Sequence, residues 1–164
     1  MGVLANTQKK KDFVLRSVSE ETKCSQACAE LYAFLKPFFV ILLKDEHRRS
    51  SRVRVFYSLS SRLIEFMIEH YAKYTVNAEG AAVISGDVTK YNELFVLVES
   101  AEVKRLYEKF RLLANIYILD AASLQDYITE HLLRTVERRL VAEYLGKRSD
   151  YKANKLEAIL KNLQ

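Results

Sequence analysis

Apolar residues recur at intervals of three and four positions along most of the chain, the spacing that places side chains on one face of an α-helix. The first such stripe consists of Ala27, Cys28, Leu31, Leu35, Phe38 and Leu42. Pro37 interrupts it and is expected to kink this helix or to split it after Leu35. Residues 1–21 lack a sustained period, so an exposed lead-in segment is predicted there, with order beginning near Thr22.

Three longer apolar stripes follow. They are preceded by a polar cluster from Asp45 to Arg54, in which Ser50 or Ser51 can cap the next helix. The predicted core of that helix is Phe56, Leu59, Leu63, Phe66, Met67 and His70, widened by Ile64, Ile68 and Tyr71. The next stripe comprises Ile84, Val88, Tyr91, Phe95 and Val98. Ser100 is expected to cap another helix, whose apolar face is Val103, Leu106, Tyr107, Phe110 and Leu113, with residues 115–119 buried behind it.

The remaining patterns are shorter. One short helix is predicted at Leu124, Tyr127 and Ile128, and another at Val136, Leu140, Val141 and Tyr144, ending at Gly146. Ser149 is expected to cap a terminal helix that docks through Leu156, Ile159, Leu160 and Leu163. With only four Gly and one Pro in 164 residues, the chain predicts an all-α bundle of six or seven helices, consecutive members antiparallel, with residues 22–164 as one domain.

The charge balance changes this interpretation only slightly. The net charge is +5, but 21 acidic residues are mixed with 26 basic ones, which is typical of solvated helix faces. The densest basic group is Arg48, Arg49, Arg52 and Arg54, a candidate contact for anionic lipid headgroups, although a solvated loop is the preferred interpretation. Nucleic-acid binding is not expected, because the aromatic residues fall on predicted core faces. The apolar run of residues 31–43 is too short to span a bilayer.

A catalytic or cofactor site is not indicated. The three histidines lack metalloprotease spacing, and no glycine-rich phosphate loop is present, so neither a metal nor a nucleotide cofactor is predicted. Cys24 and Cys28 are interpreted as reduced core residues rather than nucleophiles or zinc ligands. Glu65, Glu69 and His70 could ligate a metal, but a solvated helix edge explains the two glutamates more simply.

Motifs distributed along the chain support a sharper identification. Residues 6–13 end in Asp12 and Phe13 and resemble the Gln-Lys-Lys/Arg-Thr-Asp-Phe signature of the exocyst complex component five (Sec-ten) family, with Lys11 in place of Thr. Further matches, in the same order as in the family, are Ala27 and Cys28; Arg62, Leu63, Ile64, Glu69 and His70; Gly80 and Ala81; Asp87, Val88 and Tyr91; Leu113, Asn115 and Leu124; and Arg148, Asp150 and Tyr151. Tyr107 and Ala121 depart from a frequent Phe and Pro.

This resemblance implies a C-terminal fragment of a helical-bundle rod in a non-catalytic exocyst subunit. Such a subunit tethers secretory vesicles to the plasma membrane, and its implied partners are other exocyst subunits, with an indirect link to small GTPases on vesicles. A cytoplasmic protein recruited peripherally to sites of secretion is expected. Asp87, Asn115 and Asp150 are interpreted as caps or buried hydrogen-bond anchors. The alternatives are a fungal recyclin-type F-box protein of endocytic recycling and a peripheral lipid-binding helical module.

Overall fold

The computed structural model describes residues 13–15, 24–43, 51–132 and 135–161, and the side chains of residues 42, 43, 51, 52, 131 and 132 are not among those described. Its elements are α2 (Gln26–Leu43), α3 (Ser51–Tyr71), α4 (Ala78–Phe95), α5 (Ala101–Ile118), α6 (Leu124–Tyr127), the π-helix η1 (Ile128–Leu132), α7 (Arg138–Leu145) and α8 (Glu157–Lys161). The predicted all-α bundle is therefore confirmed.

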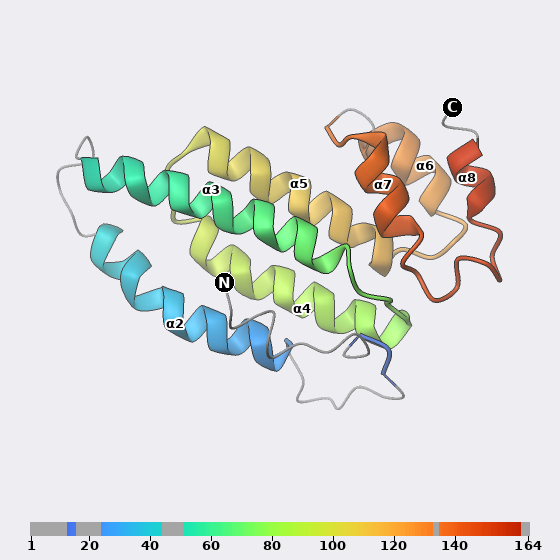
Figure 1. Cartoon of the computed structure of the whole chain (residues 1–164), viewed down its shortest axis with the longest axis horizontal. Helices are drawn as coiled ribbons and strands as arrows, with labels where there is room; N and C mark the ends of the chain where they lie inside the picture. The colour runs from blue at the N-terminus through green and yellow to red at the C-terminus, as the bar shows by residue number, and fades with distance from the viewer. Residues whose placement is uncertain (1–12, 16–23, 44–50, 133–134, 162–164) are drawn as a thin grey trace.

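The four long helices lie alongside one another, and each runs antiparallel to the next in the chain (Figure 1). The short helices α6, α7 and α8 gather at one end of this arrangement. Between described residues, extended pairing is limited to a single parallel bridge, which joins Val76 to Arg148. None of the described helices is both long and apolar enough to cross a membrane.

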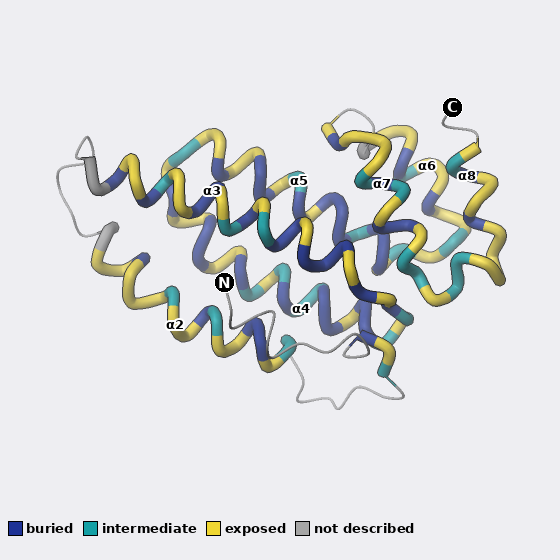
Figure 2. The backbone as a smooth tube through the Cα atoms, in the orientation of Figure 1, coloured by how far each residue is buried: buried dark blue, intermediate teal, exposed yellow. Residues whose placement is uncertain are grey.

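The core is formed mainly where α5 packs against α3 and α4, and buried positions line the inner sides of these helices (Figure 2). Aromatic rings connect the three helices: Tyr71 lies 5.5 Å from Phe110, and Phe95 lies 5.4 Å from Tyr107, measured between ring centroids. Each ring removed from water stabilises the fold by roughly 1.5 to 3 kcal/mol. All five predicted core residues of α5 are buried, from Val103 to Leu113.

Polar caps define where α4 and α5 begin. The side chain of Asn77 accepts a hydrogen bond from the amide of Gly80 at 2.9 Å, and that of Ser100 accepts one from the amide of Val103 at 3.4 Å. Each bond satisfies a backbone donor that has no partner within its own helix. The predicted role of Ser100 is thus confirmed. Asn77 was not predicted as a cap.

Helix α2 differs from prediction in two respects. It is continuous from Gln26 to Leu43 with Pro37 inside it, so it is not split after Leu35. Pro37 is exposed, and so is Ala33, whose carbonyl loses its intrahelical donor, so water can satisfy that group. The buried face is also shifted by one residue: Phe39 is buried and Phe38 is 51% exposed. On α3, Leu59 is likewise 61% exposed rather than buried.

Phe13 corrects the prediction of an exposed lead-in segment. Its side chain is fully buried against the rings of Tyr71 and Tyr74, and its carbonyl accepts a hydrogen bond from the amide of Asn77 at 3.0 Å. A Cβ at Gly80 would lie 1.9 Å from the same carbonyl oxygen, so only glycine permits this approach. Residues 16–23, which include the predicted boundary near Thr22, lie outside the described part.

The C-terminal region also differs from prediction. Helix α8 begins at Glu157, so Ser149 does not cap it. Instead, the amide of Ser149 donates to the carbonyl of Val76 at 2.8 Å, and turns occupy the residues between. Leu156 and Ile159 are buried as predicted, and Gly146 follows α7 as its C-cap.

Candidate functional site

A buried polar network joins the start of α2 to the bundle, and Asp87 of α4 is its centre. One carboxylate oxygen of Asp87 accepts a hydrogen bond from the amide of Ser25 at 2.6 Å. The other accepts from the Ser25 hydroxyl at 2.9 Å and from the Tyr71 hydroxyl of α3 at 2.7 Å. Ser25 also receives a bond from the amide of Cys28 at 3.1 Å, so it caps α2. Asp87 therefore links three helices.

Burial dominates the electrostatics of this network. Desolvation raises the pKa of Asp87, although its hydrogen bonds to Tyr71 and Ser25 act in the opposite direction. Desolvation, followed by the nearby charge of Asp87, raises the pKa of the Cys28 thiol and of the Tyr71 hydroxyl. Tyr91 is fully buried in the same region, and its pKa is raised for the same main reason. None of these groups is prepared to act as a nucleophile at neutral pH.

Cys24, Cys28 and Asp87 require a separate test as metal ligands, because one potential ligand atom from each lies within 4.8 Å of the others. Both oxygens of Asp87 already accept hydrogen bonds from Ser25 or Tyr71. The Cys28 thiol, moreover, is strongly disfavoured as a thiolate, which is the form that binds metals. The arrangement fits a structural anchor better than a metal centre.

The other candidate metal group does not converge. His70 is buried and stacks on Phe66, with ring centroids 5.6 Å apart, whereas Glu65 and Glu69 are exposed. Glu65 pairs with Arg62 at 3.2 Å. Burial lowers the pKa of His70 to about 4, and the charge of Lys73 acts in the same direction.

The predicted basic patch falls only partly within the described residues. Arg48 and Arg49 lie outside them, and Arg52 belongs to α3 but its side chain is not described. Arg54 is exposed in the first turn of α3 and lines a hollow of about 390 Å³, together with Glu65 and Glu102. The arginine patch remains a prediction, and the described member lies near acidic residues.

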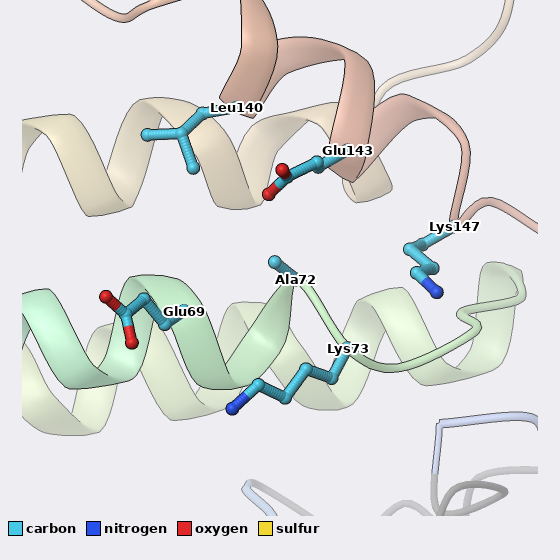
Figure 3. Close-up of a pocket in the computed structure, with 6 residues that line it drawn as sticks. All are labelled: Glu69, Ala72, Lys73, Leu140, Glu143 and Lys147. Atoms are coloured by element: carbon cyan, nitrogen blue, oxygen red, sulfur yellow. The ribbon is translucent and has the colours of Figure 1, made fainter.

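A groove lies between the last turn of α3 and α7, and Figure 3 shows its lining. Its volume is about 470 Å³, and it is lined by Glu69, Ala72, Lys73, Leu140, Glu143 and Lys147. Ala72 and Leu140 supply its apolar surface. Glu69 and Lys147 lie toward opposite ends in this view, Glu143 faces Ala72 from the α7 wall, and the Lys73 side chain extends toward the Glu69 end. This combination of apolar and charged groups suits contact with another protein surface.

Comparison with known proteins decides the family. A sequence profile described as "Exocyst complex component Sec10-like, alpha-helical bundle" matches residues 2–160. The chain belongs to this family. It is 26% identical over 148 residues to the exocyst complex component SEC10 of Saccharomyces cerevisiae, an alignment that covers 88% of this chain and 16% of that protein.

Two animal exocyst proteins give the same result. The chain is 24% identical over 156 residues to the exocyst complex component 5 of Drosophila melanogaster, covering 95% of this chain and 22% of that protein. Identity to the Caenorhabditis elegans exocyst complex component 5 is 28% over 100 residues, covering 59% of this chain and 15% of that protein. The chain thus spans less than a quarter of the length of these exocyst relatives.

Several residues that resemble the exocyst family motifs make structural contacts. Arg148 pairs with Asp150 through two bonds of 2.8 and 2.7 Å, and it also donates to the carbonyls of Ile116 and Leu119 at the end of α5. Asn115 donates to the Tyr127 hydroxyl at 3.2 Å.

Other motif positions lie at the core or beyond the described residues. Tyr151 is half-buried against the core, and Phe13 contacts Gly80 directly. Asp12 lies outside the described part. Most of these motif positions thus stabilise the exocyst-family fold, whereas Glu69, which also matches a family motif, lines the groove.

Sequence reasoning missed the groove for a physical reason. Each of its walls reads as an ordinary solvated helix surface, and the two walls are separated by about seventy residues of chain. Glu69 and Lys73, and likewise Glu143 and Lys147, are spaced as common surface pairs. No pattern within one helix indicates which other helix will lie beside it.

Proposed function

We propose that this helical bundle is a docking module of a non-catalytic exocyst subunit that tethers secretory vesicles to the plasma membrane before fusion. The observation that carries this proposal is the family match over residues 2–160, which extends across nearly the whole chain. The contacts of the motif residues are compatible with it, because Asp87, Asn115 and Arg148 hold helices together. A bundle of this kind acts by presenting helix faces to its neighbours.

The partners proposed for this module are other exocyst subunits, and its connection to small GTPases on vesicles is indirect. The protein is cytoplasmic and is recruited peripherally to sites of secretion. Contact with anionic lipids through the arginines of residues 48–54 is a separate hypothesis, tested below.

Affinity capture of the full-length parent protein tests the proposal. The parent is tagged at its endogenous locus, and the captured proteins are quantified against an untagged control. Stoichiometric recovery of exocyst subunits supports the proposed function. Recovery of ubiquitin-ligase components without exocyst subunits would instead favour the recyclin-type alternative and reject the exocyst assignment.

A second arm connects this chain to the capture result. Deleting residues 24–161 from the parent should lower the recovery of at least one exocyst subunit, whereas the Phe38→Ala variant, at an exposed position, serves as a matched control for expression. Unchanged recovery of every subunit after the deletion would show that the bundle does not dock the parent into the complex.

A further inference from the structure

The groove between α3 and α7 has walls that are fixed in place before any partner binds. The Tyr144 hydroxyl of α7 donates to the carbonyl of Ile68 in α3 at 2.8 Å, and both groups are buried. The Tyr117 ring of α5 stacks on Tyr144 at 5.1 Å, and its hydroxyl donates to the carbonyl of Tyr71 at 3.2 Å. A prearranged surface loses less conformational entropy when it binds a partner.

The end of the groove near Lys147 is fixed by backbone pairing. The amide of Val76, three residues beyond Lys73, donates to the carbonyl of Lys147 at 2.9 Å, and the amide of Ser149 donates back to Val76 at 2.8 Å. The chain segments that follow α3 and α7 are thereby held side by side. Lys73 and Lys147 project from two backbones that cannot separate without breaking this bridge.

The charges at the groove are not neutralised by each other. Glu69 and Lys73, and Glu143 and Lys147, have the spacing and order in which Glu and Lys pair best on a helix. Neither pair closes in the described structure, because α3 ends at Tyr71 and α7 ends at Leu145, before each lysine. Glu143 pairs instead with Arg139 at 3.0 Å. Glu69, Lys73 and Lys147 therefore remain available to a partner.

The arrangement of these charges gives the groove a direction. Glu69 and Leu140 lie at one end and Lys147 at the other, with Ala72 and the Glu143 carboxylate between them (Figure 3). A helix lying antiparallel to α3 would place its N-terminal part near Lys147 and its C-terminal part near Glu69. Acidic residues stabilise the first turn of a helix and basic residues stabilise the last, so such a helix can satisfy both ends at once.

We infer that this groove is the docking site for an amphipathic helix of another exocyst subunit, which runs antiparallel to α3. The docked helix presents an acidic side chain to Lys147, apolar side chains to Ala72 and Leu140, and a basic side chain to Glu69. This inference rests on the proposed function for the identity of the partner. The orientation of the docked helix and the kinds of side chain it presents are inferred from the groove itself, from its fixed walls and its available charges.

A charge exchange tests the inference without altering net charge. The full-length parent is prepared as wild type and as the double variant Glu69→Lys with Lys147→Glu, which reverses the direction of the groove. Its matched control is Glu108→Arg with Arg111→Glu, which exchanges an exposed ion pair on α5 outside the groove. Circular dichroism and thermal unfolding verify that both variants fold as the wild type does. Affinity is then measured against each purified exocyst subunit separately.

The expected result is selective. The groove exchange weakens binding to one subunit by about tenfold or more, because attraction at both ends becomes repulsion, and the control exchange leaves every affinity within about twofold. Exchanging the matching acidic and basic residues on that subunit's helix restores binding. If the groove variant binds every subunit as tightly as the control does, the groove is not a docking site, while the proposed function stands. If the wild-type parent binds no subunit, the proposed function itself fails.

Discussion

Helices α2 and α5 have the same length, 18 residues, but they are held in the bundle in different ways. α5 buries nine residues along its whole length, against α3, α4 and α7. α2 buries Ala27, Cys28, Tyr32 and Phe39, and most of its outer half is exposed. Polar contacts through Asp87 secure its first residues, and farther along the Phe39 ring packs against Phe56 and Phe95, with ring centroids 4.7 and 5.9 Å apart. α5 is held by packing along its whole length, whereas α2 combines a polar anchor at its start with fewer described buried side chains.

The outer side of α2 makes the difference clearer. Phe34, Phe38 and Ile41 are 65%, 51% and 66% exposed and follow one another at helical spacing. The Phe34 and Phe38 rings touch each other, with centroids 5.4 Å apart, rather than the core. A helix that is apolar on both faces cannot be positioned by its hydrophobic pattern alone. Its position in the bundle therefore depends on the few specific contacts that it makes.

The largest expected effect comes from removing a core ring of α5. Phe110→Ala should lower the free energy of unfolding by about 3 to 5 kcal/mol, because it leaves a cavity among Tyr71 and Tyr107. Phe38→Ala on α2 should change it by less than about 0.5 kcal/mol, since that ring is half exposed. Urea unfolding followed by circular dichroism measures both. Equal losses for the two variants would mean that α2 and α5 are held alike.

The anchor of α2 should be next in importance. Asp87→Ala leaves the hydroxyl of Tyr71 and the two donors of Ser25 without their buried acceptor, and should cost about 2 to 3 kcal/mol. Hydrogen exchange should show α2 losing protection well before α5 does. As a control, Asp126→Ala removes an exposed carboxylate and should leave both helices protected. Uniform loss of protection across the bundle would contradict the idea of a local anchor.

Lowering the pH should reduce the free energy of unfolding by somewhat less than Asp87→Ala does, through His70 in the same region. The folded-state pKa of His70 is lowered to about 4, below its unfolded value, so the unfolded state binds a proton first as pH falls. The neutral His70 ring makes its full contribution to the free energy of unfolding above about pH 6.5. That contribution falls by about 2 kcal/mol as pH falls toward 4, after allowance for solvent screening. His70 contacts Tyr71, a donor to Asp87, so loosening should begin near the anchor.

The variant His70→Phe isolates this effect. Its unfolding free energy should change less between pH 6.5 and 4 than that of the wild type, since the buried titrating ring is absent. Chemical denaturation at several pH values gives the comparison directly. A wild type and a variant with parallel pH profiles would exclude His70 as the source of acid sensitivity.

The smallest effect on stability is expected at the junction between α2 and α3. Arg54→Glu should change the unfolding free energy by less than about 0.5 kcal/mol, because the side chain is exposed. If the predicted basic patch contacts lipid, the same change should weaken binding to phosphatidylserine vesicles, and added salt should weaken it further. Vesicle co-sedimentation measures this. Equal binding by wild type and by a variant with Arg48, Arg49, Arg52 and Arg54 all reversed would remove the lipid hypothesis.

Sequence patterns were most reliable where one face of a helix is apolar and the other polar. In α5 the spacing from Val103 to Leu113 identified the core, and Ser100 identified its first turn. They were less reliable where both faces are apolar. Phe38 and Phe39 are adjacent and chemically identical, so periodicity could not determine which of them enters the core.

The sequence by itself determined the helical class of this protein and most of its core, because helix formation and amphipathic burial depend on residues a few positions apart. Only the tertiary structure decided the burial of Phe13, whose backbone lies against Gly80, the hydrogen bonds by which Asp87 joins three helices, and the groove between α3 and α7. Those features join segments tens of residues apart in the chain. Their formation depends on how whole helices pack, and no local spacing in the sequence records that packing.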